Sequence, residues 1–256
     1  MIAVRPFAVL LAVLSLPAPA VATEAVSGYD FLAPDARAMQ DDDFENPGMM
    51  TVEQGAALFR ELRPDEPESC AGCHGQDGEQ LDPKAIARYP IYNPNLGGLV
   101  TLQDQIHHCW EINLDRFPVD YDHPQIVALE AFVRHRARGE TVNVATEGPV
   151  AELLEQGKQL YGTRYGQLDM SCYHCHVQHQ GQMLRGQKLS QGQANGFPEY
   201  RLGRGRITSL HQRLRECFIS FRADPFDPGS EEFKLLELYL MSRGNGLPIE
   251  TPAVRF

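Results

Sequence analysis

The sequence predicts an all-α fold with long loops, built as two tandem domains that are related by duplication. Three observations support this prediction. Four stretches have apolar residues at helical spacing, no stretch alternates long enough to form a sheet, and one pattern recurs about 100 residues later. The 256 residues, 43% of them hydrophobic and 22% charged, suffice for one large or two ordinary globular domains. A formal charge of −11 argues against general binding to nucleic acid.

The first 22 residues predict a signal peptide. Arg5 precedes an apolar run from Phe7 to Leu16, and Ala20-Val21-Ala22 has the small residues of a cleavage site. The run is about half the length that crosses a bilayer, so we expect cleavage after Ala22 rather than an anchor. No later stretch is apolar for long enough to span a membrane. We therefore expect the mature chain in the periplasm, with a formal charge of −12 once Arg5 is removed.

The chain repeats itself at an offset of 102 residues. The first copy reads Glu53-Gln54-Gly55, Leu58-Phe59 and Ser69-Cys70-Ala71-Gly72-Cys73-His74, and the second reads Glu155-Gln156-Gly157, Leu160-Tyr161 and Ser171-Cys172-Tyr173-His174-Cys175-His176. Further on, Cys109-Trp110 has a counterpart in Cys217-Phe218 at an offset of 108, although the strict offset of 102 would place His211 opposite Cys109. An insertion of six residues upstream of His211 accounts for the difference. A period of this length is too long for a solenoid and predicts two domains, at 51–143 and 144–256, after an N-terminal arm at 23–50. The join falls in the polar stretch between Arg138 and Pro149.

Each predicted domain contains two amphipathic helices. Thr51 is the expected N-cap of a helix that ends near Glu61, and Pro124 precedes a second helix at 125–138. Helices at 150–161 and 231–242 occupy the equivalent places in the second domain. The acidic arm at 23–50 is expected to be irregular. The loops between the helices are rich in Gly and Pro and need something else to pack against, which a cofactor would provide.

Two Cys-x-x-Cys-His motifs predict the covalent attachment of two haem c groups. They are Cys70/Cys73/His74 and Cys172/Cys175/His176. Two thiols three positions apart lie on one side of a helical turn and can reach the two vinyl groups, and the adjoining imidazole then reaches the iron as proximal ligand. A zinc site and a redox Cys-x-x-Cys are the alternative interpretations. Repetition of the motif in matching surroundings favours haem, so both domains are predicted to be cytochrome c-like.

The residue on the other side of each iron distinguishes kinds of cytochrome. Electron carriers usually have methionine there, and no methionine occurs between His74 and Met170. Because Cys109 and Cys217 occupy matching places in the two copies, we predict that both are axial thiolate ligands. A disulfide between them is the alternative. The other candidates are His107, His108, His123 and His135 for the first haem, and His179, Met183, His211 and Met241 for the second.

A basic segment leads into Cys217. From Gln180 to Arg215 its only acid is Glu199, against Arg185, Lys188, Arg201, Arg204, Arg206, Arg213 and Arg215. Arg213 would share the face of Cys217 if the turn between them is helical. A guanidinium there could hold a tetrahedral oxyanion and favour the thiolate form of Cys217, whereas a solvated basic face is the alternative. His211 is either a proton-handling residue or a packed histidine, and we favour packing.

The combination resembles the SoxA family, the dihaem subunits of the SoxAX cytochrome complex of bacterial thiosulfate oxidation. The two Cys-x-x-Cys-His motifs, a lone cysteine after each, and the segment Gly203–Arg213 leading into Cys217 carry the resemblance, which covers the mature chain. It implies that His74 and Cys109 ligate haem 1 and that His176 and Cys217 ligate haem 2. It also implies that Cys217 is the active-site cysteine, seen in the family as a persulfide, and that Arg213 binds substrate.

The resemblance further implies a reaction and its partners. In the family, an L-cysteine S-thiosulfotransferase joins thiosulfate oxidatively to a cysteine of the carrier protein SoxYZ. A separate monohaem SoxX subunit completes the heterodimer and passes the electrons to a downstream cytochrome. Two other functions stay open, a stand-alone thiosulfate dehydrogenase that forms tetrathionate and a dihaem electron carrier without catalysis. The missing methionine in the first domain argues against the electron carrier.

Overall fold

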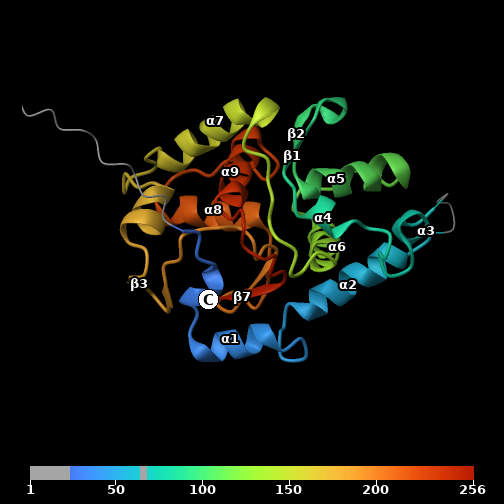
Figure 1. Ribbon diagram of the computed structural model, residues 1–256, viewed down its shortest axis with the longest axis horizontal. Helices are drawn as coiled ribbons and strands as arrows, with labels where there is room; N and C mark the ends of the chain where they lie inside the picture. Colours follow the sequence, from blue (N-terminus) through green and yellow to red (C-terminus); the bar gives the residue numbers. More distant parts are fainter. Residues whose placement is uncertain (1–23, 64–67) are drawn as a thin grey trace, which may run out of the picture.

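Two helix pairs form the centre of the computed structural model, which describes residues 24–63 and 68–256. Helix α2 packs along α6 and helix α7 packs along α9 (Figure 1). The predicted signal peptide at 1–22 lies outside the described residues. Among the residues described, no helix has the length and apolarity that a membrane span requires.

The first half of the described chain combines the long helices α2 and α6 with shorter elements. In chain order its elements are η1 (Gly28–Phe31), α1 (Pro34–Asp41), α2 (Met49–Arg60), α3 (Cys70–His74), α4 (Pro83–Ile86), β1 (Ile91–Asn93), η2 (Pro94–Leu96), β2 (Gly98–Val100), α5 (Leu102–His108), η3 (Cys109–Asn113) and α6 (Pro124–His135).

The second half alternates longer helices with short strands. Its elements are η4 (Gly148–Val150), α7 (Ala151–Gly162), η5 (His174–Gln178), β3 (Met183–Leu184), β4 (Gln187–Lys188), β5 (Glu199–Arg201), β6 (Arg206–Thr208), α8 (Leu210–Ser220), α9 (Glu231–Ser242) and β7 (Ala253–Arg255).

The four predicted helices are present, with shifted ends. Helix α2 begins at Met49, before the predicted cap Thr51, because the Asn46 side chain accepts a hydrogen bond from Gly48 N and closes the preceding turn (2.9 Å). Helix α6 ends at His135, before the predicted end at 138. The chain turns away there through Gly139, which has a φ of 87° and donates its N–H to Ile249 O (2.9 Å). Helix α9 has the predicted limits.

In each helix pair, a glycine lies where the backbones of the two helices come close together. A Cβ atom on Gly55 of α2 would lie 2.0 Å from the Ala128 carbonyl oxygen of α6. A Cβ atom on Gly157 of α7 would lie 2.2 Å from the Leu235 carbonyl oxygen of α9. Real side chains cannot approach a backbone this closely, so both positions require glycine. The two copies of the Glu-Gln-Gly sequence thus make the same kind of helix contact.

One apolar core connects the two helix pairs. Its side chains include Phe59 and Phe132 from the α2–α6 pair, with ring centroids 4.9 Å apart. They also include Tyr161 and Leu236 from the α7–α9 pair, both almost fully buried. Because the apolar stripes of all four helices turn toward this core, the shorter segments that carry polar groups lie around it.

The all-α prediction was wrong in one respect, because short strands are present. Strands β1 and β2 form one antiparallel hairpin and β3 and β4 form another. Strand β5 pairs antiparallel with β6 and parallel with β7, which lies at the C-terminal end of the chain. Segments of two or three residues are too short to show an alternating pattern, and the pairing of β5 with β7 joins residues far apart in sequence.

The N-terminal arm is not irregular, which corrects a second prediction. Helix α1 lies beside β7 (Figure 1), where the Gln40 side-chain oxygen accepts from Val254 N (3.0 Å). The Asn46 amide donates to Pro252 O (2.9 Å). Asp43, an acidic residue of this arm, pairs with Arg138. The acidic arm therefore folds because the C-terminal segment supplies partners for its polar groups.

The polar stretch predicted as the join is fixed by hydrogen bonds. Val142 N donates to Leu247 O (2.9 Å), and Ile249 N donates to Glu140 O (2.9 Å). The Asn245 side chain bonds both the N–H and the carbonyl of Val144 (2.8 and 2.9 Å). The stretch thus runs alongside the C-terminal segment as an ordered connection.

We expect Gly157→Ala to lower the free energy of unfolding by about 1–3 kcal/mol, because the new methyl group would overlap the Leu235 carbonyl of α9. Gly162→Ala is the matched control on the same helix, since a Cβ atom there meets nothing within 4 Å. We expect its effect to stay within about 0.5 kcal/mol. Equilibrium urea unfolding of the haem-loaded protein measures both. Equal stability of Gly157→Ala and the wild type would contradict the close helix approach.

Candidate functional site

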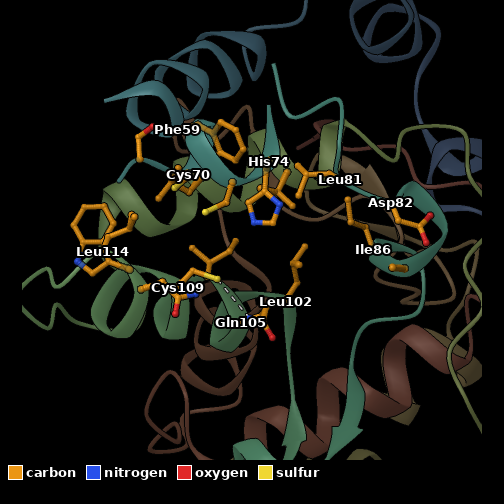
Figure 2. A pocket seen from close by; sticks show the side chains of 18 of the residues that line it. Phe59, Cys70, His74, Leu81, Asp82, Ile86, Leu102, Gln105, Cys109 and Leu114 are labelled. Carbon is orange, nitrogen blue, oxygen red and sulfur yellow. Dashed lines mark hydrogen bonds between the residues drawn. The ribbon is translucent and has the colours of Figure 1, made fainter. Parts of the chain in front are cut away.

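The first Cys-x-x-Cys-His motif opens onto a cavity of about 300 Å³. Figure 2 shows His74 and Cys109 pointing into it from opposite sides. Most of the other lining side chains are apolar, among them Phe59, Leu81, Ile86, Leu102 and Leu129. The cavity thus combines two thiols and an imidazole on one wall, a sulfur on the facing wall and apolar surroundings. This donor set fits a haem c group.

Helix α3 places the three motif residues of the first site. The Ser69 hydroxyl caps it by accepting from Gly72 N (3.2 Å). The single turn that follows brings the Cys70 and Cys73 thiols and the His74 ring to the same cavity. Burial raises the pKa of the Cys70 thiol to about 11, and nearby Cys109 raises it further while Arg116 lowers it. Cys70, predicted to attach the haem, and Cys109, predicted to ligate its iron, therefore lie close together.

Cys109 stands where α5 passes into η3, a turn of π-helix. Such turns are frequent at functional sites because they displace a side chain from the regular helical path. Trp110 is buried and donates its ring N–H to Phe117 O (3.0 Å), and the Arg116 guanidinium lies 4.4 Å from the centre of its ring. These contacts fix the turn that aims Cys109 at the cavity.

The second motif is held by the loop at 190–192. The Nδ1 atom of His176 lies 2.9 Å from the Ser190 carbonyl, so Nδ1 carries the proton and Nε2 keeps its lone pair. A Cβ atom on Gly192, which has a φ of 78°, would lie 2.8 Å from the His176 ring. His176 keeps some exposed surface, but desolvation of its ring lowers its pKa to about 4. Sequence reasoning missed this loop, although a glycine after Ser-Gln is a weak sign of a turn.

Cys217 on α8 lies near both thiols of the second motif. Burial raises the pKa of Cys172 to about 12, and the charge of Cys217 is the next largest cause. The same two causes, in the same order, raise the pKa of Cys175. The predicted set Cys172, Cys175, His176 and Cys217 is therefore gathered between η5 and α8. Ser209 begins α8 by accepting from Gln212 N (3.1 Å) while its hydroxyl donates to Asp122 (2.6 Å).

Arg213 stands one helical turn before Cys217, as predicted. The charge of the Cys217 thiolate is the largest cause that raises the pKa of Arg213, so the two groups are electrostatically close. The Arg213 side chain is only partly covered, with 27% of its surface exposed. Arg213 thus places a positive charge near the Cys217 sulfur.

The basic segment has less unpaired positive charge than its residue count predicts. Glu216, the residue directly after the counted segment, pairs with both Arg213 (3.3 Å) and Arg204 (3.0 Å). Arg201 pairs with Glu199 (3.1 Å). Helical spacing could have indicated the first pair, because Arg213 and Glu216 are three positions apart. The cation close to Cys217 is thus Arg213, oriented by a carboxylate.

The alternative interpretations of the cysteines find no support in the described part of the chain. Cys109 and Cys217 are both free thiols and lie in different sites, so the disulfide is absent. Among the described residues, no group of three or more His, Cys, Asp or Glu side chains is placed to hold a metal ion by itself.

Several of the other candidate distal ligands have partners or surroundings of their own. His123 caps α6, His135 faces Thr251 O (3.1 Å), and His107 lies 3.0 Å from Tyr121 O. Met241 is buried in the core, whereas Met183 is 63% exposed on β3. Cys109, unlike these histidines, lines the first cavity.

His211 is a packed histidine. It is buried, its Nδ1 accepts from Gly229 N (3.0 Å), and its Nε2 lies 3.2 Å from a Glu237 oxygen. Its ring stacks on Tyr121, with centroids 4.9 Å apart, and Tyr121 stacks in turn on His107 at 5.5 Å. The residue thus joins α8, α9 and the loop before α6, in agreement with the favoured interpretation.

Comparison with known proteins identifies the family. A model described as SoxA/TsdA cytochrome c domain matches residues 54–142 and 156–249. A SoxA subunit of L-cysteine S-thiosulfotransferase from Rhodovulum sulfidophilum is 42% identical over 230 residues, which cover 90% of this chain and 79% of that protein. The chain belongs to the SoxA family. Its cofactor is therefore covalently bound haem c, as expected for a cytochrome c domain.

Two further comparisons agree with the family. The SoxA subunit of Pseudaminobacter salicylatoxidans is 38% identical and aligns with 91% of this chain and 81% of its own length. The crystal structure of SoxXA from P. pantotrophus matches with a TM-score of 0.82 and 36% identity, covering 90% of this chain and 86% of that chain. The predicted cytochrome c fold and the resemblance to SoxA are thereby confirmed.

The buried carboxyl of Glu130 on α6 makes stability depend on pH. Burial raises its pKa from 4.5 to about 8, which Arg134 partly opposes and Glu237 reinforces. Between these two values the folded protein holds a proton that the unfolded chain releases, so its stability falls as the pH rises, by up to about 1.4 kcal/mol per pH unit. We expect Glu130→Gln to gain stability relative to the wild type between pH 5 and pH 9.

Urea unfolding of the haem-loaded protein at pH 5, 7 and 9 tests this expectation. Glu152→Gln, the same exchange at an exposed carboxylate on α7, is the matched control. A stability difference between Glu130→Gln and wild type that is the same at all three pH values would contradict a protonated Glu130.

Proposed function

We propose that this chain is the SoxA subunit of an L-cysteine S-thiosulfotransferase, which joins thiosulfate oxidatively to a cysteine of the carrier protein SoxYZ. The observation that carries the proposal is the position of Arg213 one turn before Cys217 on α8, next to the second Cys-x-x-Cys-His motif. An anion-binding cation beside a reactive sulfur suits a substrate that is itself an anionic sulfur compound.

The chain is proposed to consist of two duplicated cytochrome c-like domains, each with one haem c. The domains are 51–143 and 144–256, after an arm at 23–50. The equal close approaches at Gly55 and Gly157 support a common origin, as do the two matched motif sequences. Long loops around a small core agree with a cofactor that completes the interior of each domain.

The proposed ligands are His74 and Cys109 for haem 1 and His176 and Cys217 for haem 2. Opposed placement of His74 and Cys109 across the first cavity supports the first pair (Figure 2). The proton on Nδ1 of His176 and the nearness of Cys217 to Cys172 and Cys175 support the second. When bound, haem 2 supplies a one-electron acceptor beside the reacting sulfur.

The protein's own groups have separate roles in the proposed reaction. Joining a carrier thiol to thiosulfate forms one sulfur–sulfur bond and releases two electrons and one proton. Arg213 binds the sulfonate oxygens and offsets the repulsion between the anion and the Cys217 thiolate. Cys217, as a thiolate or a persulfide, is the sulfur group that meets the substrate. Glu216 holds the Arg213 guanidinium in place through their ion pair at 3.3 Å.

The proposed partners follow from the relatives. The matched crystal structure is of a SoxXA complex, so a monohaem SoxX is proposed as the second subunit of a heterodimer. SoxYZ is the proposed protein substrate, and a downstream cytochrome is the proposed acceptor of the electrons. The signal-peptide pattern with cleavage after Ala22 supports a periplasmic location.

A stand-alone thiosulfate dehydrogenase is the second candidate, because the matching family model includes TsdA as well as SoxA. The two functions differ in what the purified chain does alone. Formation of tetrathionate from thiosulfate without SoxX or SoxYZ would favour the dehydrogenase. A dihaem electron carrier without catalysis has less support, because a cysteine lines the first cavity where a carrier would have methionine.

We expect Cys217→Met to retain haem 2 and to lose thiosulfate-dependent activity by about two orders of magnitude or more, because methionine can occupy an axial position but cannot act as a thiolate or persulfide. Haem content from the absorption spectrum and turnover with SoxX and SoxYZ measure the two effects. Full activity of this variant would contradict the assignment.

Cys109→Met, the same exchange at the first site, is the matched comparison. It should alter the spectrum of haem 1 and remain at least tenfold more active than Cys217→Met, because the first site has no arginine at the corresponding place. Equal losses in the two variants would contradict the assignment of the active site to Cys217.

A further inference from the structure

One helical position differs between the two proposed haem sites. Gln105 stands four residues before Cys109, and Arg213 stands four residues before Cys217. Helix α5 runs into the turn that carries Cys109, and α8 contains both Arg213 and Cys217. Residues four apart lie on the same helix face, so each residue faces the sulfur that follows it. The first site has a neutral amide in this position and the second has a cation.

The amide of Gln105 is bonded to the sulfur. Its Nε2 donates to Cys109 Sγ over 3.5 Å, drawn as a dashed line in Figure 2. The Tyr89 hydroxyl donates to Gln105 Oε1 (3.5 Å), which orients the amide so that its NH₂ group faces the sulfur. Both residues line the same cavity as His74 and Cys109. The sulfur thus has a donor that is itself held in place.

We propose that Gln105 is a positioning residue that directs the Cys109 sulfur and limits its electron donation to the iron, a role for which the second site has no neutral amide at the corresponding position 213. The inference rests on the proposed axial ligation by Cys109 and Cys217.

The chemical consequence concerns the reduction potential of haem 1. A hydrogen bond to a ligating sulfur draws electron density away from the iron and so stabilises the reduced state. A neutral amide does this without a net charge, so it offers an anion no ionic partner. Arg213 combines a donor with a positive charge, and the charge of Cys217 is the largest cause that raises the pKa of Arg213. The residue four positions before the cysteine therefore differs with the role of the site. Gln105 suits a haem that only stores electrons, whereas Arg213 suits a site that also binds an anion.

Variants at position 105 test the proposal in the haem-loaded complex with SoxX. Gln105→Leu removes the donor at similar volume and should make reduction of haem 1 about tenfold less favourable, about 59 mV for one electron. Gln105→Arg adds a charge and should raise the potential above that of the wild type. The expected order of potentials is Leu, Gln, Arg from lowest to highest, measured by redox titration, with EPR g-values of the oxidised haem as a second readout.

Gln103→Leu is the matched control on the same helix. The Gln103 amide donates to Tyr121 O (2.6 Å) and to Asp122 (3.2 Å) instead of to sulfur. Removal of this amide should therefore leave the reduction potential of haem 1 unchanged. Tyr89→Phe should lower the potential in the same direction as Gln105→Leu but by less, because it removes only the group that orients the amide.

The outcomes separate this inference from the proposed function. A thiolate EPR signature in the wild type with equal potentials in Gln105→Leu, Gln103→Leu and wild type would overturn the role of Gln105 alone. Absence of the thiolate signature in the wild type would overturn the proposed ligation. If Gln105→Leu fails to incorporate haem, Gln105→Arg and Tyr89→Phe still test the proposal. A potential of haem 1 in Gln105→Arg that is lower than in the wild type would overturn it.

Discussion

The position of a sulfur opposite an imidazole, across an apolar cavity, is the constraint on which the functional account depends. In the first site His74 comes from the short helix α3, and Cys109 comes from the π-helical turn after α5. Neither segment would hold such a position alone, because each is only about one turn long. Helices α2 and α6, packed together at Gly55, supply the rigid support behind them.

The second site has the same parts and a different electrostatic setting. Cys217 lies on the regular helix α8, which also carries Arg213 and Glu216. The arginine places a positive charge near the sulfur, while the glutamate pairs with it and reduces the excess of positive charge around it. The proposed division of work, with one site storing electrons and the other reacting with thiosulfate, therefore depends on a few residues around otherwise similar ligands.

Sequence patterns predicted the parts of the molecule that depend on local order. Helical periodicity located α2, α6, α7 and α9, and the spacing of Cys-x-x-Cys-His located the motif turns, because both patterns reflect a single turn of helix. The strands, the folded arm and the loop that bonds His176 were missed. These features depend on contacts such as β5 with β7, Gln40 with Val254 and Ser190 with His176, whose partners lie too far along the chain for a local pattern to show them.

Low-temperature EPR of the oxidised protein with both haems bound tests the central claim most directly, because the g-values of a low-spin iron report its two axial ligands. The account predicts histidine–thiolate signals from both irons. A spectrum with histidine–methionine or bis-histidine signals would contradict sulfur ligation by Cys109 and Cys217, and the mechanism built on Cys217 would fail with it.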